Sequence, residues 1–64
     1  GSVKFLKSQD NIDYFAVTLE PNAPLVIGKL SGIWERANGK QSSCQICLSD
    51  TEINLQIRSR LNFI

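Results

Sequence analysis

The sequence predicts a small all-β domain, built as an antiparallel five-stranded sheet or a partly open barrel. Three observations lead to this prediction. Polar and apolar residues alternate along two long segments, residues 12–20 and 53–64. Glycines interrupt the apolar stretch between these segments, as is typical of bent strands. An Asn-Gly pair, the strongest short signal for a tight β-hairpin turn, follows that stretch.

Length and composition indicate one small folded domain. The chain has 64 residues, of which 42% are hydrophobic and 20% are charged, and its net charge is +1. Residues 1–2 are typical of an expression-tag remnant, so the expected single β domain covers residues 3–64. A chain this short buries only about 60% of its unfolded surface, so we expect marginal stability. The near-neutral charge does not show the basic excess of a typical nucleic-acid binder.

The first two strands are predicted at residues 3–7 and 12–20. The polar cluster between them, residues 8–11, is typical of a turn. The second segment is rich in Val, Thr, Tyr and Phe, which favour strands, and its alternation gives it one apolar face. Pro21 and Pro24 end this strand, because proline cannot donate a hydrogen bond to a sheet and has a fixed φ.

The middle of the chain is predicted to form a hairpin. Residues 25–37 are interpreted as one bent strand or two short strands, because Gly28 and Gly32 interrupt the pattern. Asn38 and Gly39 are then the two central residues of a type I′ turn, which requires positive φ at both positions. The chain after this turn returns as a further strand.

Cys44 and Cys47 form a Cys-x-x-Cys pattern, which is often a metal or redox site. In an extended strand, however, side chains three residues apart point to opposite faces. The chain also has no histidine and no third cysteine. We therefore predict no metal site and no cofactor. Unbridged thiols favour a reducing compartment, so an intracellular location is expected.

The last segment, residues 53–64, alternates so regularly that a strand with a buried Ile57 is the main prediction. Residues 49–52 have the Ser-x-x-Glu form of a helix capping box. An α+β fold with a C-terminal helix from about residue 50 is the alternative.

Catalysis has few candidate residues in this sequence. The absence of histidine removes the commonest general base near neutral pH. The chain also lacks a glycine-rich phosphate loop and a serine nucleophile motif. No apolar run approaches the eighteen or so residues that a membrane span needs. We therefore expect a non-catalytic protein without a membrane partner.

The sequence favours a protein-interaction module or assembly domain that binds through a strand edge or a Trp/Arg surface. Its partner would be another protein or a second copy of itself in a homo-oligomer. Tryptophan and arginine are enriched at interfaces, and arginine donates two hydrogen bonds from its planar head. The candidate binding residues are Tyr14, Trp34, Arg36, Gln56, Arg58 and Arg60.

Two alternative functions follow from the same residues. The first is a small nucleic-acid-binding barrel of the OB-like or SH3-like kind, in which aromatic rings stack on bases and cations contact phosphate. The second comes from the Gly-x-Trp at Gly32 and Trp34. The segment 30–50 around it resembles part of the small bacterial β-barrel metalloprotease inhibitors. That resemblance implies a β-barrel that inhibits a protease.

Overall fold

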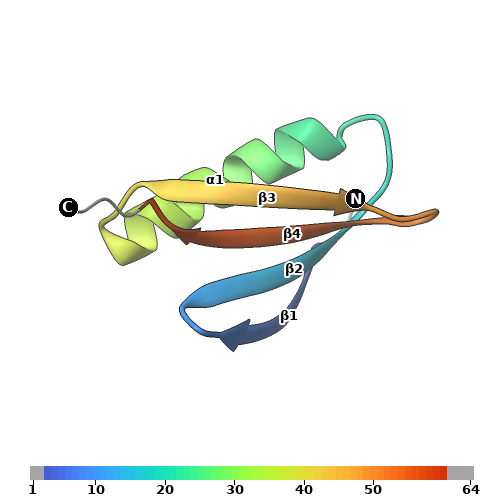
Figure 1. Cartoon of the computed structure of the whole chain (residues 1–64). Coiled ribbons are helices and arrows are strands. Elements are labelled where there is room, and N and C mark those ends of the chain that lie inside the picture. Colours follow the sequence, from blue (N-terminus) through green and yellow to red (C-terminus); the bar gives the residue numbers. More distant parts are fainter. Residues whose placement is uncertain (1–2, 61–64) are drawn as a thin grey trace.

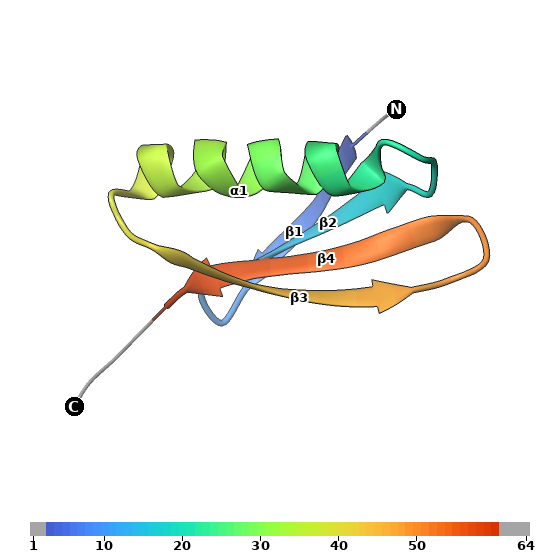
Figure 2. The ribbon, with the colours of Figure 1, turned by 90° about the horizontal axis from the view of Figure 1, so that it is seen from above.

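The computed structural model describes residues 3–60, which form mostly strands with one helix (Figure 1). The four strands make a single open antiparallel sheet in the order β1-β2-β4-β3. The helix lies along one face of this sheet (Figure 2). The elements are β1 (Val3–Gln9), β2 (Ile12–Thr18), α1 (Ala23–Asn38), β3 (Ser42–Leu48) and β4 (Glu52–Ser59).

The prediction of strands across residues 25–37 is wrong, because α1 covers this segment. Its apolar residues Ile27, Leu30 and Trp34 recur at helical spacing and pack on the core. Sequence reading gave weight to the two internal glycines, each of which costs a helix about 1 kcal/mol relative to alanine. Packing of the apolar face outweighs that cost, as it does in most protein helices.

The predicted Asn38-Gly39 hairpin turn is also wrong. Gly39 ends α1 in the left-handed conformation, with φ 66° and ψ 27°. Its N–H donates to the carbonyl oxygen of Glu35 at 2.8 Å, which satisfies one of the unpaired groups at the helix end. The positive φ expected of glycine is therefore present, but it terminates a helix and does not reverse a hairpin.

The turn between β1 and β2 is the one that has the expected hairpin geometry. Asp10 and Asn11 have φ angles of 56° and 65°, which is the sign pattern of a two-residue type I′ loop. A turn within residues 8–11 is thus confirmed, although β1 extends to Gln9 and only residues 10–11 form the loop. The following strand is also confirmed as Ile12–Thr18, and it ends before the two prolines.

The last segment is a strand, so the alternative of a C-terminal helix from about residue 50 is wrong. Ile53, Leu55 and Ile57 are at most 5% exposed, which confirms the buried apolar row. The Ser-x-x-Glu motif stabilises a hairpin: the Ser49 hydroxyl donates to the carbonyl of Glu52 and accepts from its N–H. The four strands of residues 3–60 do not close into a barrel, and residues 61–64 of the predicted strand lie outside the described residues.

The core lies between α1 and the two central strands of the sheet. Its buried members are Val17 from β2, Ala23 from α1, and Ile53, Leu55 and Ile57 from β4. Because side chains alternate along each strand, the opposite face of the sheet carries the other half of the residues. That second face is not covered by any element among residues 3–60, and we call it the open face.

Candidate functional site

The structure brings together three of the six predicted binding residues. Tyr14 and Gln56 are direct partners in the β2–β4 ladder, and Arg58 lies two residues further along β4. All three side chains therefore belong to the open face. Trp34 and Arg36 lie on α1, on the other side of the sheet, so the structure does not form a joint Trp/Arg surface.

Trp34 connects the helix to the first hairpin. It is partly buried against the core, and its indole N–H donates to Asp13 Oδ2 at 2.9 Å. The other carboxylate oxygen of Asp13 accepts from the Ser8 hydroxyl at 2.7 Å. A single carboxylate thus links α1, β2 and β1. This arrangement indicates a structural contribution from Trp34, because its polar group is already bonded within the chain.

The open face is polar and mainly cationic. Lys7 Nζ lies 4.9 Å from the centre of the Tyr14 ring, which is cation–π distance. The ladder places Lys4 opposite Ala16, which is next to Tyr14 on this face. Glu52, at the far end of β4, is the carboxylate of this face within the four strands. The polar side chains of the open face are Lys4, Lys7, Gln9, Tyr14, Thr18, Ser43, Gln45, Glu52, Asn54, Gln56 and Arg58.

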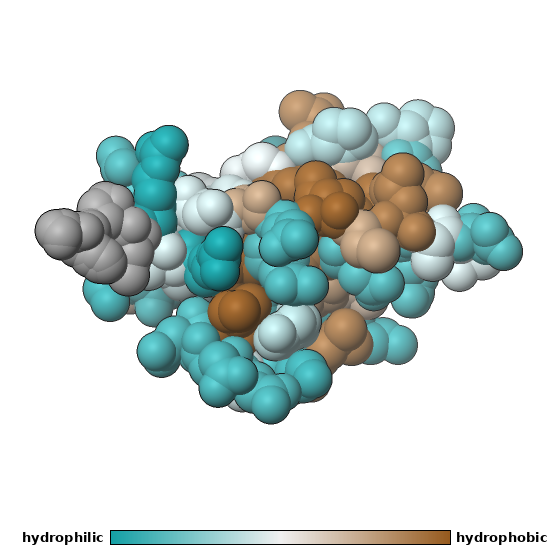
Figure 3. Space-filling model, viewed as in Figure 1, coloured by the Kyte–Doolittle hydropathy of each residue, from teal (hydrophilic) through white to brown (hydrophobic). Residues whose placement is uncertain are grey.

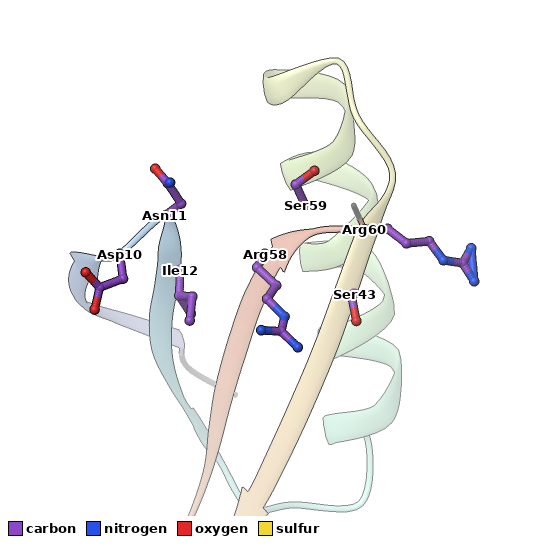
Figure 4. A pocket seen from close by; sticks show the side chains of 7 residues that line it. All are labelled: Asp10, Asn11, Ile12, Ser43, Arg58, Ser59 and Arg60. Carbon is purple, nitrogen blue, oxygen red and sulfur yellow. The ribbon is translucent and has the colours of Figure 1, made fainter. Parts of the chain in front are cut away.

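A hollow of about 500 Å³ lies where β2 begins and β4 ends. Figure 4 shows Arg58 and Ile12 on adjacent strands in this hollow, while the Arg60 side chain points away from Arg58. Asp10, in the β1–β2 turn, borders the same hollow, but its carboxylate points away from Arg58 (Figure 4). The full lining is Asp10, Asn11, Ile12, Ser43, Arg58, Ser59 and Arg60.

The second candidate surface is the outer edge of β3, which pairs with no other strand within residues 3–60. Arg60 N–H donates to Gln41 C=O, and Ser49 N–H donates to Glu52 C=O, at 2.8 and 2.9 Å. Bonding direction alternates along an antiparallel strand, so the odd-numbered residues of β3 bond to β4. The N–H and C=O groups of Cys44, Ile46 and Leu48 therefore point away from the sheet. We call these three residues the β3 edge.

The Glu35 carboxylate occupies the outward N–H of Ser42, the first residue of β3, and leaves the β3 edge unoccupied. Its Oε2 accepts from the Ser42 N–H at 2.7 Å and from the Ser42 hydroxyl at 2.8 Å. Ser42 is even-numbered, so its N–H also points outward, and here a carboxylate takes the place of a neighbouring strand. These two hydrogen bonds, followed by the charge of Arg60, hold the pKa of Glu35 below its ordinary value, although desolvation opposes them.

Side chains of the β3 edge lie on the helix side of the sheet. Ile46 faces the buried Leu55, and Leu48 faces Ile53, yet they remain 50% and 67% exposed. Figure 3 shows hydrophobic side chains gathered at the upper right, where β3 ends and α1 begins. Residues 41–48 contain no charged residue. The β3 edge thus combines outward backbone groups with apolar, uncharged side chains.

The two cysteines lie on opposite faces of β3, as the extended geometry predicts. Cys44 is on the helix side, where its Sγ lies 3.0 Å from Ser31 Oγ, and Cys47 belongs to the open face. Both thiols are free. Within residues 3–60, no three His, Cys, Asp or Glu side chains gather in a way that could hold a metal ion.

Comparisons with protein-family models, with curated proteins and with solved structures give no match for this chain. In the described part of the chain, no helix combines the length and the apolar character that crossing a membrane requires. The candidate surfaces therefore rest on geometry. Sequence reading identified three open-face residues, but it missed the β3 edge because strand order is set by contacts between distant segments.

Proposed function

We propose that this chain is a protein-interaction module that binds an extended segment of a partner protein along the β3 edge. The observation that carries the proposal is the outward direction of the Cys44, Ile46 and Leu48 backbone groups on a strand without charge or bulge. Such an edge is a template for strand addition, because every outward N–H and C=O can pair with an incoming strand.

Both backbone hydrogen bonds and apolar side-chain contacts would contribute to the binding free energy. Each backbone hydrogen bond contributes about 0.5–1.5 kcal/mol net, without regard to sequence. The half-exposed Ile46 and the more exposed Leu48 would gain burial from alternate side chains of the incoming strand. This gives the partner a recognisable chemistry, namely an extended segment with apolar residues at every second position on its helix-side face.

A charge at the centre of the edge tests this proposal. Immobilised Ile46→Lys protein should lose partners that the original chain captures from its source cells. Leu25→Lys is the control, because Leu25 is an apolar residue that is even more exposed, at 68%, but lies on α1. Hydrogen exchange of the captured complex should show new protection at the amides of Cys44, Ile46 and Leu48. Capture that is equal for both variants would contradict binding at this edge.

The open face supports a second candidate function, the binding of single-stranded nucleic acid. The specific observation is that Tyr14 lies beside Lys7 and shares its face with Lys4 and Arg58. A ring that can stack on a base, with cations that can contact phosphate, is the usual arrangement for such binding. One aromatic ring is fewer than most sheet-based binders use, so we rank this function second.

Salt dependence separates this candidate from strand addition. Fluorescence anisotropy with a labelled single-stranded oligonucleotide should show weaker binding as salt rises. Arg58→Ala should lower the slope of log affinity against log salt by about one, as expected for one lost phosphate contact. Arg36→Ala, on α1, is the control and should leave the slope unchanged. Binding that ignores both salt and Arg58 would exclude this use of the open face.

A further inference from the structure

We propose that the partner of the β3 edge is a second copy of this chain, so that two sheets join into one antiparallel sheet of eight strands. This inference rests on the proposed function, since it names the strand that the edge receives. Each copy contributes its four strands, and the two β3 strands meet at a twofold axis perpendicular to the sheet. Such an interface is self-complementary, because the same residues lie on both sides of it.

The absence of charge favours self-pairing. Residues 41–48 carry no charged side chain, so two β3 strands can lie side by side without like-charge repulsion. The other outer strand differs. β1 carries Lys4 and Lys7, and its pairing with β2 is irregular between Phe5 and Lys7. Both features oppose the addition of another strand.

The position of Glu35 determines the register of the pairing. Its carboxylate already occupies the outward N–H of Ser42, which leaves Cys44, Ile46 and Leu48 open. The centre of this open stretch is Ile46. A twofold axis at Ile46 makes Ile46 face the partner's Ile46, while Cys44 faces the partner's Leu48. An axis at Gln45 would instead require Ser42 to pair with the partner's Leu48.

Side-chain chemistry agrees with this register. Side chains of residues that face one another across a ladder lie on the same side of the sheet. Cys44, Ile46 and Leu48 all lie on the helix side, so apolar side chains meet apolar side chains across the axis. Ile46 and Leu48 are at least half exposed in the single chain, and the partner strand supplies the cover that α1 does not reach.

Light scattering after gel filtration, under reducing conditions from micromolar to about millimolar protein, tests the dimer. The expected result is a concentration-dependent dimer for the original chain and for Leu25→Lys. Ile46→Lys places two lysines face to face at the axis, and like charges in contact weaken association by about a hundredfold or more. A monomer throughout this range, or a dimer that tolerates Ile46→Lys, overturns the inference.

Disulfide formation tests the register. In a background with Cys44→Ser and Cys47→Ser, Ile46→Cys should oxidise to a covalent dimer, because the paired Cα atoms would lie about 5.5 Å apart. Gln45→Cys should not form this dimer in the same background. The reverse result overturns the axis at Ile46. If the chain is monomeric but its capture of another protein still depends on Ile46, then the self-pairing inference fails and the proposed function stands.

Discussion

The two outer strands of this sheet expose similar amounts of apolar side chain but differ in charge and regularity. On β1, Phe5 is 57% exposed, and on β3, Ile46 is 50% exposed. β1 nevertheless carries two lysines and an irregular register, whereas β3 is regular and uncharged. Figure 3 shows a mostly hydrophilic surface towards the β1 side and a hydrophobic one near the end of β3.

This difference teaches that hydrophobic exposure alone does not identify a binding edge. Phe5 packs edge-on against Phe15, with ring centres 5.5 Å apart, so part of its apolar surface has a partner within the chain. Leu48 on β3 is exposed at 67%, more than any of the apolar residues of β1. Proteins commonly protect an edge with lysine and bulges, and only β1 shows these devices.

The largest expected effect comes from comparing a central isoleucine with an edge isoleucine. Ile57 on β4 is fully buried, whereas Ile46 on β3 is half exposed, and both lie on the helix side. Ile57→Ala should lower the free energy of unfolding by about 2–5 kcal/mol, because it removes a buried side chain and leaves a cavity. Ile46→Ala should cost about 1 kcal/mol or less.

Urea denaturation of both variants at low micromolar protein measures this pair. Low concentration keeps association of the β3 edge from adding to the stability of the original chain. Equal losses for the two variants would show that Ile46 is buried in the single chain. The central strand β4 and the outer strand β3 would then not differ in the burial of their helix-side residues.

The next effect concerns the connection that brings the chain from α1 to β3. Gly39→Val should destabilise the fold by about 1–2 kcal/mol, because a side chain there has to adopt the left-handed conformation. Gly28→Ala is the matched control on the same helix: it has no positive φ, and an added Cβ meets nothing within 4 Å. That control should stabilise the fold by about 0.5–1 kcal/mol. Thermal denaturation of both variants should show a lower melting temperature for Gly39→Val and a higher one for Gly28→Ala.

A smaller effect is expected at the hydrogen bond that joins α1 to the β1–β2 hairpin, between Trp34 and Asp13. Trp34→Phe keeps an aromatic ring against the core but loses the hydrogen bond to Asp13, which should cost about 1 kcal/mol. Asp13→Asn in the Trp34→Phe background should then cost less than it does in the original chain, because their shared interaction is already lost. Additive losses in this double-mutant cycle would mean that the two side chains do not interact in solution.

The strands could be predicted from the sequence because their signal is local. Ile53, Leu55 and Ile57 alternate with polar residues, and this pattern alone places them on one buried face. The helix could not be predicted in the same way, because Gly28 and Gly32 obscured the spacing of its apolar residues. Only packing against the sheet shows that this spacing dominates.

The candidate surfaces likewise have a part that local sequence patterns predict and a part that depends on long-range strand pairing. Tyr14, Gln56 and Arg58 were predictable as surface residues because each lies at a polar position of an alternating strand. Their closeness in space depends on β2 pairing with β4, which are separated in the chain by α1 and β3. The β3 edge is likewise a product of strand order. A local pattern carries no information about which strand ends up at the rim of a sheet.

The smallest effect tests the hydrogen bonds that Glu35 accepts from Ser42 at the beginning of β3. Since hydrogen bonds from Ser42 lower the pKa of Glu35 from its ordinary value of 4.5, the unfolded chain takes up this proton at higher pH than the folded chain. The stabilisation is therefore complete above pH 4.5 and is lost as the pH falls through the lowered folded-state pKa. Glu35→Gln keeps an acceptor for Ser42 but removes the titration, so the original chain should be more stable at neutral pH. That advantage should shrink below pH 4.5.

Urea denaturation from pH 7 to 3 measures the difference in free energy of unfolding between the original chain and Glu35→Gln. Asp50→Asn, in the exposed β3–β4 turn, controls for the change in net charge. An advantage that persists unchanged into acid would mean that the carboxylate does not bond Ser42, and the strand would then be open along its whole length.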